Sequence, residues 1–352
     1  MRIPHHPPRR AFAVLIVLVA AMVLSILAAA LAIFMKVESQ LAQNSNDSEQ
    51  LLWIGRAGVE RACWILAQEP PGPTSLKQIW AGGSGDGPET NSPLMGISLS
   101  GFQVGGGTVD ISMVEQESKF NINTADGELL HSVLNTMGAK PDEQSTVADS
   151  IQDWVGPGDA ARPAGAKSDY YQGLSPSYNA KNAPIDDIQE LQFIRGVTPN
   201  LYNGTSPGEN GPFQHHKLGF GPAPGQPDEL AFGLKDVFTP YSSGKVNINT
   251  AGANVLNCIP FMDTNIVGNI ITFRTSEGDT LGDNGVIRNL GQLQGMVAIP
   301  AILQQLQRYC TVAGSTYEVT VKAHVGPNSR EFVAVIIRNG NNQASVVRFY
   351  PK

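Results

Sequence analysis

The feature that most constrains this chain is an uncharged, apolar run near its N-terminus, from Ala11 to Met35. As an α-helix, a run of this length spans roughly 37 Å, which is enough to cross the hydrocarbon core of a bilayer with some tilt. Arg9 and Arg10 stand directly before the run. Because basic flanking residues favour the cytoplasmic side of a membrane, the run predicts a single-pass anchor with a cytoplasmic N-terminus and an exported body.

Three kinds of N-terminal segment fit this run. A secretory signal peptide would be cut after small residues such as those at 28–30, and a plain signal anchor would stay uncut. The third kind is the prepilin leader, in which a short basic stretch and a small residue precede a Phe that opens the apolar run. Ala11 and Phe12 follow two arginines in this way, so the segment resembles the type IV pilin and type II secretion pseudopilin signal. The resemblance implies cleavage by a prepilin peptidase between Ala11 and Phe12, although that family usually has Gly where Ala11 stands.

The fifth residue of the expected mature chain is Ile16, whereas most pilins carry Glu there. In those families the Glu is thought to pair with the N-terminal ammonium of the neighbouring subunit nearer the tip. An unpaired carboxylate at membrane depth costs roughly 2.5–3.5 kcal/mol. Ile16 at this subunit-docking position therefore suggests a tip subunit with no subunit above it. The alternative is that Ile16 is one more apolar residue of a membrane helix.

The anchor is expected to continue as a helix outside the membrane. Apolar residues recur at helical spacing from Leu52 to Leu66, and Pro70 ends the pattern. The polar stretch Asn44–Ser48 has poor helix propensity, so it predicts a kink or weak point.

A phrase of seven residues occurs twice in the body of the chain. Lys119–Ala125 reads KFNINTA and Lys245–Ala251 reads KVNINTA, which indicates an internal repeat. We expect the Ile of each copy to point into the core and the Thr to be the N-cap of a following helix.

The same phrase is familiar from helix-hairpin-helix proteins, including competence DNA receptors, in which a Gly-x-Gly turn binds a phosphate. Neither copy has that turn, since 137–141 and 260–264 stand in its place. The formal net charge of −7 also opposes binding to nucleic acid. We therefore expect no nucleic-acid partner, with a membrane-anchored DNA receptor kept as an alternative.

Strand-like segments flank the repeats. Alternating apolar residues at 97–102 and 108–114 precede them, and 316–325, 331–338 and 345–350 follow as an antiparallel meander. The predicted fold class is α+β. It combines a pilin-like long N-terminal helix and an antiparallel sheet with a large inserted α-helical region that contains two helix-hairpin-helix-like repeats. The predicted division is leader 1–11, pilin helix 12–68, linker and first strands 69–117, first helical unit 118–202, linker 203–228, second helical unit 229–310 and C-terminal strands 311–352.

These features in this order resemble the K-type minor pseudopilin of type II secretion systems. Further phrases carry the resemblance: Arg56–Ala62, Ile151–Val155, Arg162–Ala166, Asn182–Leu191 and Arg195–Val197. It implies a non-enzymatic subunit in the bacterial inner membrane, with a periplasmic body that caps the pseudopilus tip and acts in filament initiation and protein export. The implied partners are the I- and J-type minor pseudopilins, the major pseudopilin and the prepilin peptidase. A minor pilin of a type IV pilus is a near alternative.

The resemblance also implies calcium (Ca2+) in the loop after Asp153-Trp154. Asp153, Asp159 and Asp169 are the candidate ligands, but two glycines and Lys167 stand where further acidic residues are expected. Since calcium prefers six to eight oxygen ligands, turn and capping roles are favoured for these aspartates.

Catalytic chemistry has no support in the sequence. There is neither a His-Glu-x-x-His nor a Gly-x-Ser-x-Gly motif, so a signal-anchored periplasmic enzyme has no feature in its favour. Cys258 and Cys310 bracket the second helical unit in what should be an oxidising compartment, so they form either a disulfide or two buried thiols.

Overall fold

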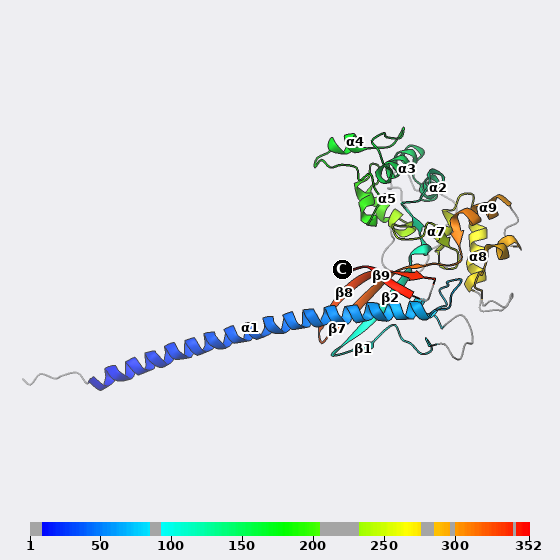
Figure 1. Cartoon of the computed structure of the whole chain (residues 1–352). Coiled ribbons are helices and arrows are strands. Elements are labelled where there is room, and N and C mark those ends of the chain that lie inside the picture. Colours follow the sequence, from blue (N-terminus) through cyan, green and yellow to red (C-terminus); the bar gives the residue numbers. More distant parts are fainter. Residues whose placement is uncertain (1–8, 85–92, 205–231, 276–284, 296–299, 341–342) are drawn as a thin grey trace, which may run out of the picture.

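One long helix and a head made of a sheet and a helical region form this protein. The computed structural model describes residues 9–84, 93–204, 232–275, 285–295, 300–340 and 343–352. Helix α1, Arg9–Gln68, projects far beyond the head, and the helical region lies near its C-terminal end (Figure 1). Among the described residues it is the one helix long and apolar enough to cross a membrane.

The predicted kink at Asn44–Ser48 is wrong, because α1 is continuous through this stretch. Asp47 accepts a hydrogen bond from Asn328 Nδ2 at 2.9 Å, and Leu51 begins the buried part of the helix. Asn, Asp and Ser each cost a helix less than about 0.7 kcal/mol, so packing just beyond them is sufficient to keep the helix intact.

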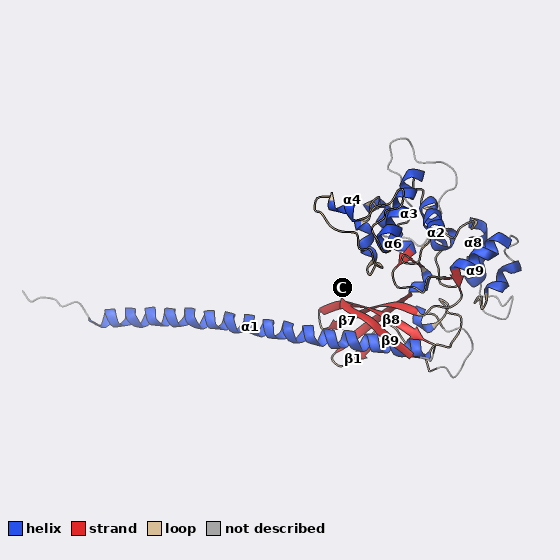
Figure 2. Ribbon diagram, turned by 45° about the horizontal axis from the view of Figure 1, so that its top comes forward, coloured by secondary structure: helices blue, strands red, loops and turns tan. Residues whose placement is uncertain are grey.

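The sheet has five antiparallel strands in the order β1-β2-β7-β8-β9 (Figure 2). Strand β2 pairs with β7 from Thr108–His324 to Glu115–Tyr317, although the helical region separates these strands in sequence. The prediction that the helical region is inserted into one sheet is therefore confirmed. The predicted strand at 97–102 is wrong except for its last residue. The strand bounds are β1 Phe102–Val104, β2 Gly107–Glu115, β7 Thr316–Val325, β8 Asn328–Asn339 and β9 Gln343–Pro351.

Helix α1 covers one face of this sheet. A Cβ atom on Gly55 would lie 2.4 Å from the Phe332 ring, and one on Gly58 would lie 2.5 Å from a methyl group of Val321. The two glycines therefore let the helix backbone approach the strands closely. The buried residues of the interface come from α1 and from β2, β7 and β8, and form a core separate from that of the helical region.

The helical region consists of short helices and two small parallel strand pairs. The first part contains η2 Gln116–Ser118, β3 Phe120–Asn121, α2 Gly127–Thr136, α3 Pro141–Val155, α4 Ser168–Gln172, η3 Ile188–Phe193, α5 Pro199–Asn203, α6 Leu234–Val237 and β4 Phe238–Thr239. The second part contains β5 Val246–Asn247, α7 Ala253–Asn257, α8 Thr264–Thr275, η4 Leu290–Gly295, α9 Pro300–Tyr309 and β6 Cys310–Thr311. A 3-10 turn, η1 Ile79–Ala81, follows α1.

The two copies of the repeated phrase close their units in the same way. Strand β3 pairs in parallel with β4, and β5 pairs in parallel with β6. Strand β4 thus pairs with the first copy, although the predicted division assigns it to the second unit. Most of the predicted linker 203–228 lies outside the described residues.

Lysine begins each copy and has the same role in both. Lys119 Nζ donates to the carbonyl of Lys235 at 2.9 Å, and Lys245 Nζ donates to the carbonyl of Gln307 at 2.9 Å. Each of these carbonyls lies three positions before the strand that closes the unit. A lysine ammonium thus satisfies a carbonyl near the C-terminal end of a helix in both copies.

The Ile of each copy points into the core as expected, since Ile122 and Ile248 are buried. The expected N-cap role of the Thr residues is wrong. Asp126 is the N-cap of α2 and accepts from Leu129 N at 2.8 Å, while Gly252 precedes α7. The reason is that the Asn-Ile-Asn-Thr stretch closes its own turn, which delays the start of the helix by two residues.

Candidate functional site

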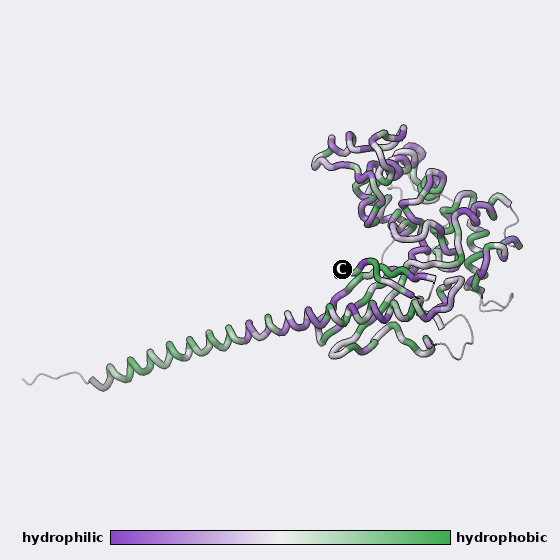
Figure 3. Tube along the Cα trace, viewed as in Figure 1, coloured by the Kyte–Doolittle hydropathy of each residue, from purple (hydrophilic) through white to green (hydrophobic). Residues whose placement is uncertain are grey.

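The N-terminal half of α1 exposes a continuous apolar surface. All described side chains from 12 to 46 are exposed, including Phe12 at 70% and Ile16 at 58%. Figure 3 shows the hydrophobic colour along the part of α1 that projects beyond the head. Ala11 lies within the helix, and its side chain is outside the described part. An exposed apolar surface of this extent fits a single-pass membrane anchor.

The packed half of α1 also presents aromatic and charged side chains on its outer face. Trp53 is 64% exposed and Trp64 is 42% exposed. The Arg56 guanidinium lies 5.2 Å from the centre of the Trp53 ring and 5.9 Å from that of Phe349 in β9. We call Trp53, Arg56, Trp64 and Phe349 the outer aromatic surface. Exposed Trp and Arg residues of this kind are typical of protein–protein contacts.

A buried carboxylate joins the sheet to the second unit. Glu115, at the end of β2, is 1% exposed and accepts hydrogen bonds from Thr74 Oγ1 at 2.5 Å, from Asn247 Nδ2 at 3.0 Å and from Thr250 Oγ1. Burial raises the pKa of Glu115 to about 7, although these three donors oppose the shift. The side chain thus connects the segment after α1, the sheet and the second copy of the phrase.

Glu117 is a second buried carboxylate, and it connects the helical region to the start of β7. It is fully buried and accepts from the backbone N–H groups of Ser243 at 3.2 Å and Thr316 at 3.1 Å. Because Thr316 begins β7 and Ser243 precedes the second copy, one carboxylate fixes the point where the helical region enters the sheet. Such donors compensate for the loss of hydration.

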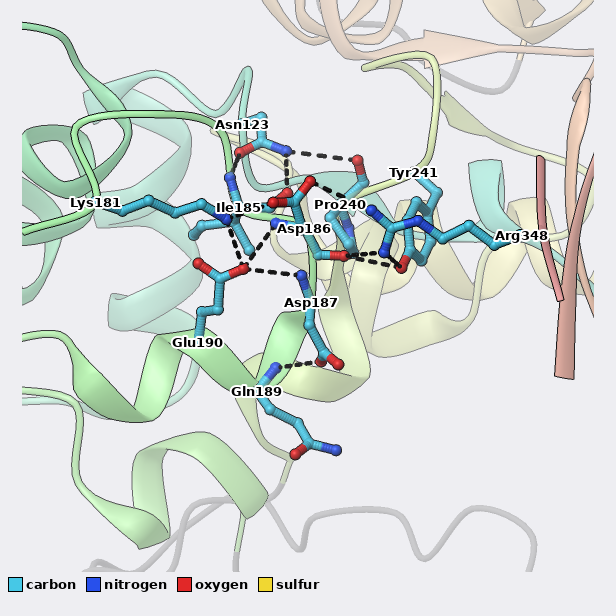
Figure 4. Close-up of polar contacts among 10 residues, drawn as sticks. All are labelled: Asn123, Lys181, Ile185, Asp186, Asp187, Gln189, Glu190, Pro240, Tyr241 and Arg348. Atoms are coloured by element: carbon cyan, nitrogen blue, oxygen red, sulfur yellow. Dashed lines mark hydrogen bonds and ion pairs between the residues drawn. The ribbon is translucent and has the colours of Figure 1, made fainter. Parts of the chain in front are cut away.

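A polar cluster connects the first unit to the edge strand β9 (Figure 4). Arg348 Nη1 donates to the carbonyl of Asp186 at 3.1 Å and to Tyr241 Oη at 3.0 Å, and Arg348 Nη2 lies 3.3 Å from the Asp186 carboxylate. Lys181 pairs with Asp186 at 2.7 Å and with Glu190 at 2.8 Å. The hydrogen bond from Lys181 lowers the pKa of Asp186. We call these five residues the Arg348 cluster.

The second half of each repeat was not recognised from the sequence. Asn123 Oδ1 accepts from Ile185 N at 2.6 Å and its Nδ2 donates to Ile185 O at 3.0 Å, while Asn249 makes both bonds to Ile287 at 2.9 Å. Glu190 Oε1 accepts from the backbone N–H groups of residues 186 and 187. Gln292 Oε1 accepts from those of residues 288 and 289. Residues 185–191 and 287–293 share the pattern Ile-x-Asp/Asn-x-x-Glu/Gln-Leu, which is the sequence signal of this second half.

The three candidate calcium ligands do not form a cluster. Asp153 is 1% exposed and binds Arg162, accepting from its backbone N–H at 3.0 Å and from Nη1 at 2.7 Å. Asp159 and Asp169 are exposed. Within the described ranges, no group of three or more His, Cys, Asp or Glu side chains could hold a metal ion.

Lys167 fills the centre of this loop. Its Nζ donates to the carbonyls of Asp153 at 2.5 Å and Gly156 at 2.7 Å and to Asn182 Oδ1 at 2.8 Å. The residue is 5% exposed. Oxygen atoms that could face a bound cation therefore face a lysine ammonium.

Cys258 and Cys310 are free thiols in the structure, and both are buried. Burial raises the pKa of each thiol to about 12. Of the two expected states, the structure contains the pair of buried thiols. His324 Nε2 lies 3.2 Å from Asp110 Oδ2 on the sheet. His215 and His216 lie outside the described residues.

Comparison with known proteins shows which family the first helical unit resembles. Residues 110–207 match the family model described as type II secretion system (T2SS), protein K. Over this range the chain is similar to the protein K family. The matched range covers the end of the sheet strand β2 and nearly all of the first unit, including Glu115, Lys167 and most of the Arg348 cluster.

Two curated relatives carry the same description. The chain is 22% identical over 215 residues to type II secretion system protein K of Klebsiella pneumoniae, which covers 56% of this chain and 61% of the relative. It is 24% identical over 217 residues to that of Aeromonas hydrophila, covering 55% and 61%. The matches thus span about three fifths of the length of these relatives.

A solved structure has the same fold. It is a chain of the GspK-GspI-GspJ complex from the type 2 secretion system of enterotoxigenic Escherichia coli. The TM-score is 0.62 at 16% identity, and the match covers 88% of this chain and 99% of that chain. The predicted fold class, a long N-terminal helix with an antiparallel sheet and additional helices, is therefore confirmed. The family model and the solved structure thus both relate this chain to protein K of type II secretion systems.

Proposed function

We propose that this protein is a non-enzymatic minor pseudopilin that initiates the pseudopilus and remains at its tip during protein export. The observation that carries the proposal is the combination of an exposed apolar half of α1 with a large head around the opposite end of the same helix (Figure 1). The apolar half would lie first in the inner membrane and then among the helices of other subunits. The head would lie in the periplasm.

The position of Ile16 supports a place at the tip. A subunit inside a filament has another subunit above it, to which a carboxylate at this depth could pair. Ile16 is 58% exposed on the apolar part of α1 and offers no charge. An uncharged residue avoids the cost of an unpaired carboxylate in lipid. After cleavage between Ala11 and Phe12 by the prepilin peptidase, Ile16 would be the fifth residue of the mature protein.

The shape of the head supports the same place. The helical region adds two units beyond the sheet, near the end of α1 that faces away from the apolar half (Figures 1 and 2). If the α1 helices of a filament lie roughly side by side along its axis, this bulk occupies the space that a further subunit would need. Only the uppermost position leaves that space free.

The proposed partners are the I- and J-type minor pseudopilins, with the major pseudopilin below them. The solved relative of this fold comes from a complex with GspI and GspJ. In this chain the outer aromatic surface offers exposed Trp53 and Trp64 beside Arg56. Aromatic and Arg side chains supply most of the binding energy in many interfaces. We propose that this surface contacts one of the two partners.

The test is co-purification of the full-length chain, in detergent, with the I- and J-type pseudopilins of the same secretion system. We expect a stable ternary complex and a loss of about tenfold or more in affinity for Trp53→Ala, because exposed Trp anchors contribute roughly 2 kcal/mol or more. Leu76→Ala, which truncates another exposed apolar side chain, is the control. Failure to bind either pseudopilin, or salt-dependent binding to DNA, would overturn the proposal. Binding to type IV minor pilins alone would assign the chain to a pilus.

A further inference from the structure

At the end of α3, three oxygen atoms surround the ammonium group of Lys167. A lysine ammonium has three N–H donors, and here each has one oxygen acceptor: the carbonyls of Asp153 and Gly156 and the side-chain oxygen of Asn182. The lysine is 5% exposed, so water contributes little to its solvation. Burial of a charge is tolerated only where such partners replace water.

The helix itself favours a positive charge at this place. Asp153 belongs to the last turn of α3, and Gly156 is its C-cap residue. The last carbonyls of a helix have no partner within the helix, and the helix dipole makes this end negative. Lys167 satisfies two of these carbonyls. It also reaches Asn182, so one ammonium joins the end of α3, the start of α4 and the segment that leads to the Arg348 cluster.

The carboxylates around the loop are used elsewhere or point to solvent. Both oxygens of Asp153 bind Arg162, and a Cβ atom on Gly165 would lie 1.9 Å from Asp153 Oδ2, so the carboxylate is tightly enclosed on that side. Asp149 accepts from Ala164 N at 3.1 Å. Calcium requires six to eight oxygens, mostly from carboxylates and carbonyls. The residues present therefore do not fit the calcium ion that the family resemblance implied.

We infer that the Lys167 ammonium is a built-in structural cation that takes the place of a bound divalent ion, so that the loop from Asp153 to Asn182 is ordered without metal. A divalent ion in the same position would stand within a few ångströms of the ammonium and be repelled by it. The inference concerns the first helical unit alone. It does not depend on the position of the protein in a filament.

The first test is hydrogen–deuterium exchange of the full-length protein in detergent, with 1–152 and 183–352 as internal reference. We expect the peptides that cover 153–182 to show equal protection in about 2 mM calcium chloride and in about 2 mM EDTA, since the ammonium is always present. Protection that increases at least about threefold with calcium, confined to these peptides, would overturn the inference.

The second test replaces the ammonium. Lys167→Met keeps most of the side-chain volume but leaves two helix carbonyls without donors, so we expect faster exchange at 153–182 and a melting temperature lower by at least about 5 °C. Lys181→Met is the matched control, because Lys181 pairs with carboxylates that are partly in solvent. Equal effects of the two variants would contradict the inference. If Lys167→Met does not fold, the comparison of calcium with EDTA on the wild type remains decisive.

Discussion

Asn249 holds Ile287 by two hydrogen bonds of 2.9 Å from a single side-chain amide, one to the backbone N–H and one to the carbonyl. Asn123 holds Ile185 in the same way in the first unit, across a longer stretch of chain. The second Asn of each repeated phrase therefore connects the beginning of its helical unit to a later segment of the same unit. We call this pair of hydrogen bonds the clamp.

Removal of this clamp should destabilise the head. Asn249 is 3% exposed, so Asn249→Ala leaves the N–H and carbonyl of Ile287 buried without a partner. Each such group costs roughly 1–3 kcal/mol, and we expect the free energy of unfolding to fall by about 2–4 kcal/mol. Urea unfolding measures this change, with Asn265→Ala, at an exposed position of α8, as control. An effect no greater than that of the control would contradict the role of the clamp.

Glu115 should make stability depend on pH. Burial raises its pKa in the folded protein to about 7, above the ordinary value of 4.5. The folded state therefore holds the proton more tightly, and the contribution of Glu115 is fully present below about pH 4.5 and is lost as pH rises through about 7. Urea unfolding between pH 4 and pH 8 should show a smaller loss for Glu115→Gln than for the wild type. Parallel pH profiles would show that Glu115 does not titrate in this way.

The close contact between α1 and the sheet predicts opposite effects for two helical glycines. Gly58→Ala places a methyl group 2.5 Å from Val321, so it should destabilise the protein by roughly 1–3 kcal/mol through overpacking. Gly268→Ala in α8 meets no atom within 4 Å and should be neutral or stabilising by up to about 1 kcal/mol. Thermal unfolding of both variants tests this, and equal melting temperatures would contradict the packing described.

The Arg348 cluster should act locally. Arg348 is 40% exposed, and exposed ion pairs contribute little to stability, so the loss of this pair should leave the free energy of unfolding nearly unchanged. Arg348→Ala should nevertheless accelerate hydrogen exchange around 181–190, because the carbonyl of Asp186 loses a donor from β9. Lys352→Ala, which removes an exposed ion pair between β8 and the residue directly after β9, is the control. Unchanged exchange at 181–190 would mean that the cluster does not fix the first unit on the sheet.

The sequence predicts the architecture well because its signals are strong and local. The uncharged run of α1, the alternating strands after Cys310 and the doubled Asn-Ile-Asn-Thr-Ala each imply one kind of element. It predicts the site less well. Thr124 and Thr250 resemble N-caps, but the Asn-clamped turn extends past them. Glu190 and Gln292 both accept hydrogen bonds from two backbone N–H groups. Because one side chain is a carboxylate and the other an amide, the sequence does not reveal this shared role. In the sequence, Lys167 is visible only as a lysine at a position where an acidic residue is expected. Its three oxygen acceptors come together only in the folded chain.

The mature N-terminus tests the central claim most directly. Intact-mass and N-terminal peptide analysis of the protein, expressed with its own prepilin peptidase, should find a chain that begins at N-methylated Phe12. That result follows if α1 carries a prepilin leader and the protein is a pseudopilin. A chain that begins near Ala30, or that retains Met1–Ala11 in the presence of active peptidase, would contradict the account.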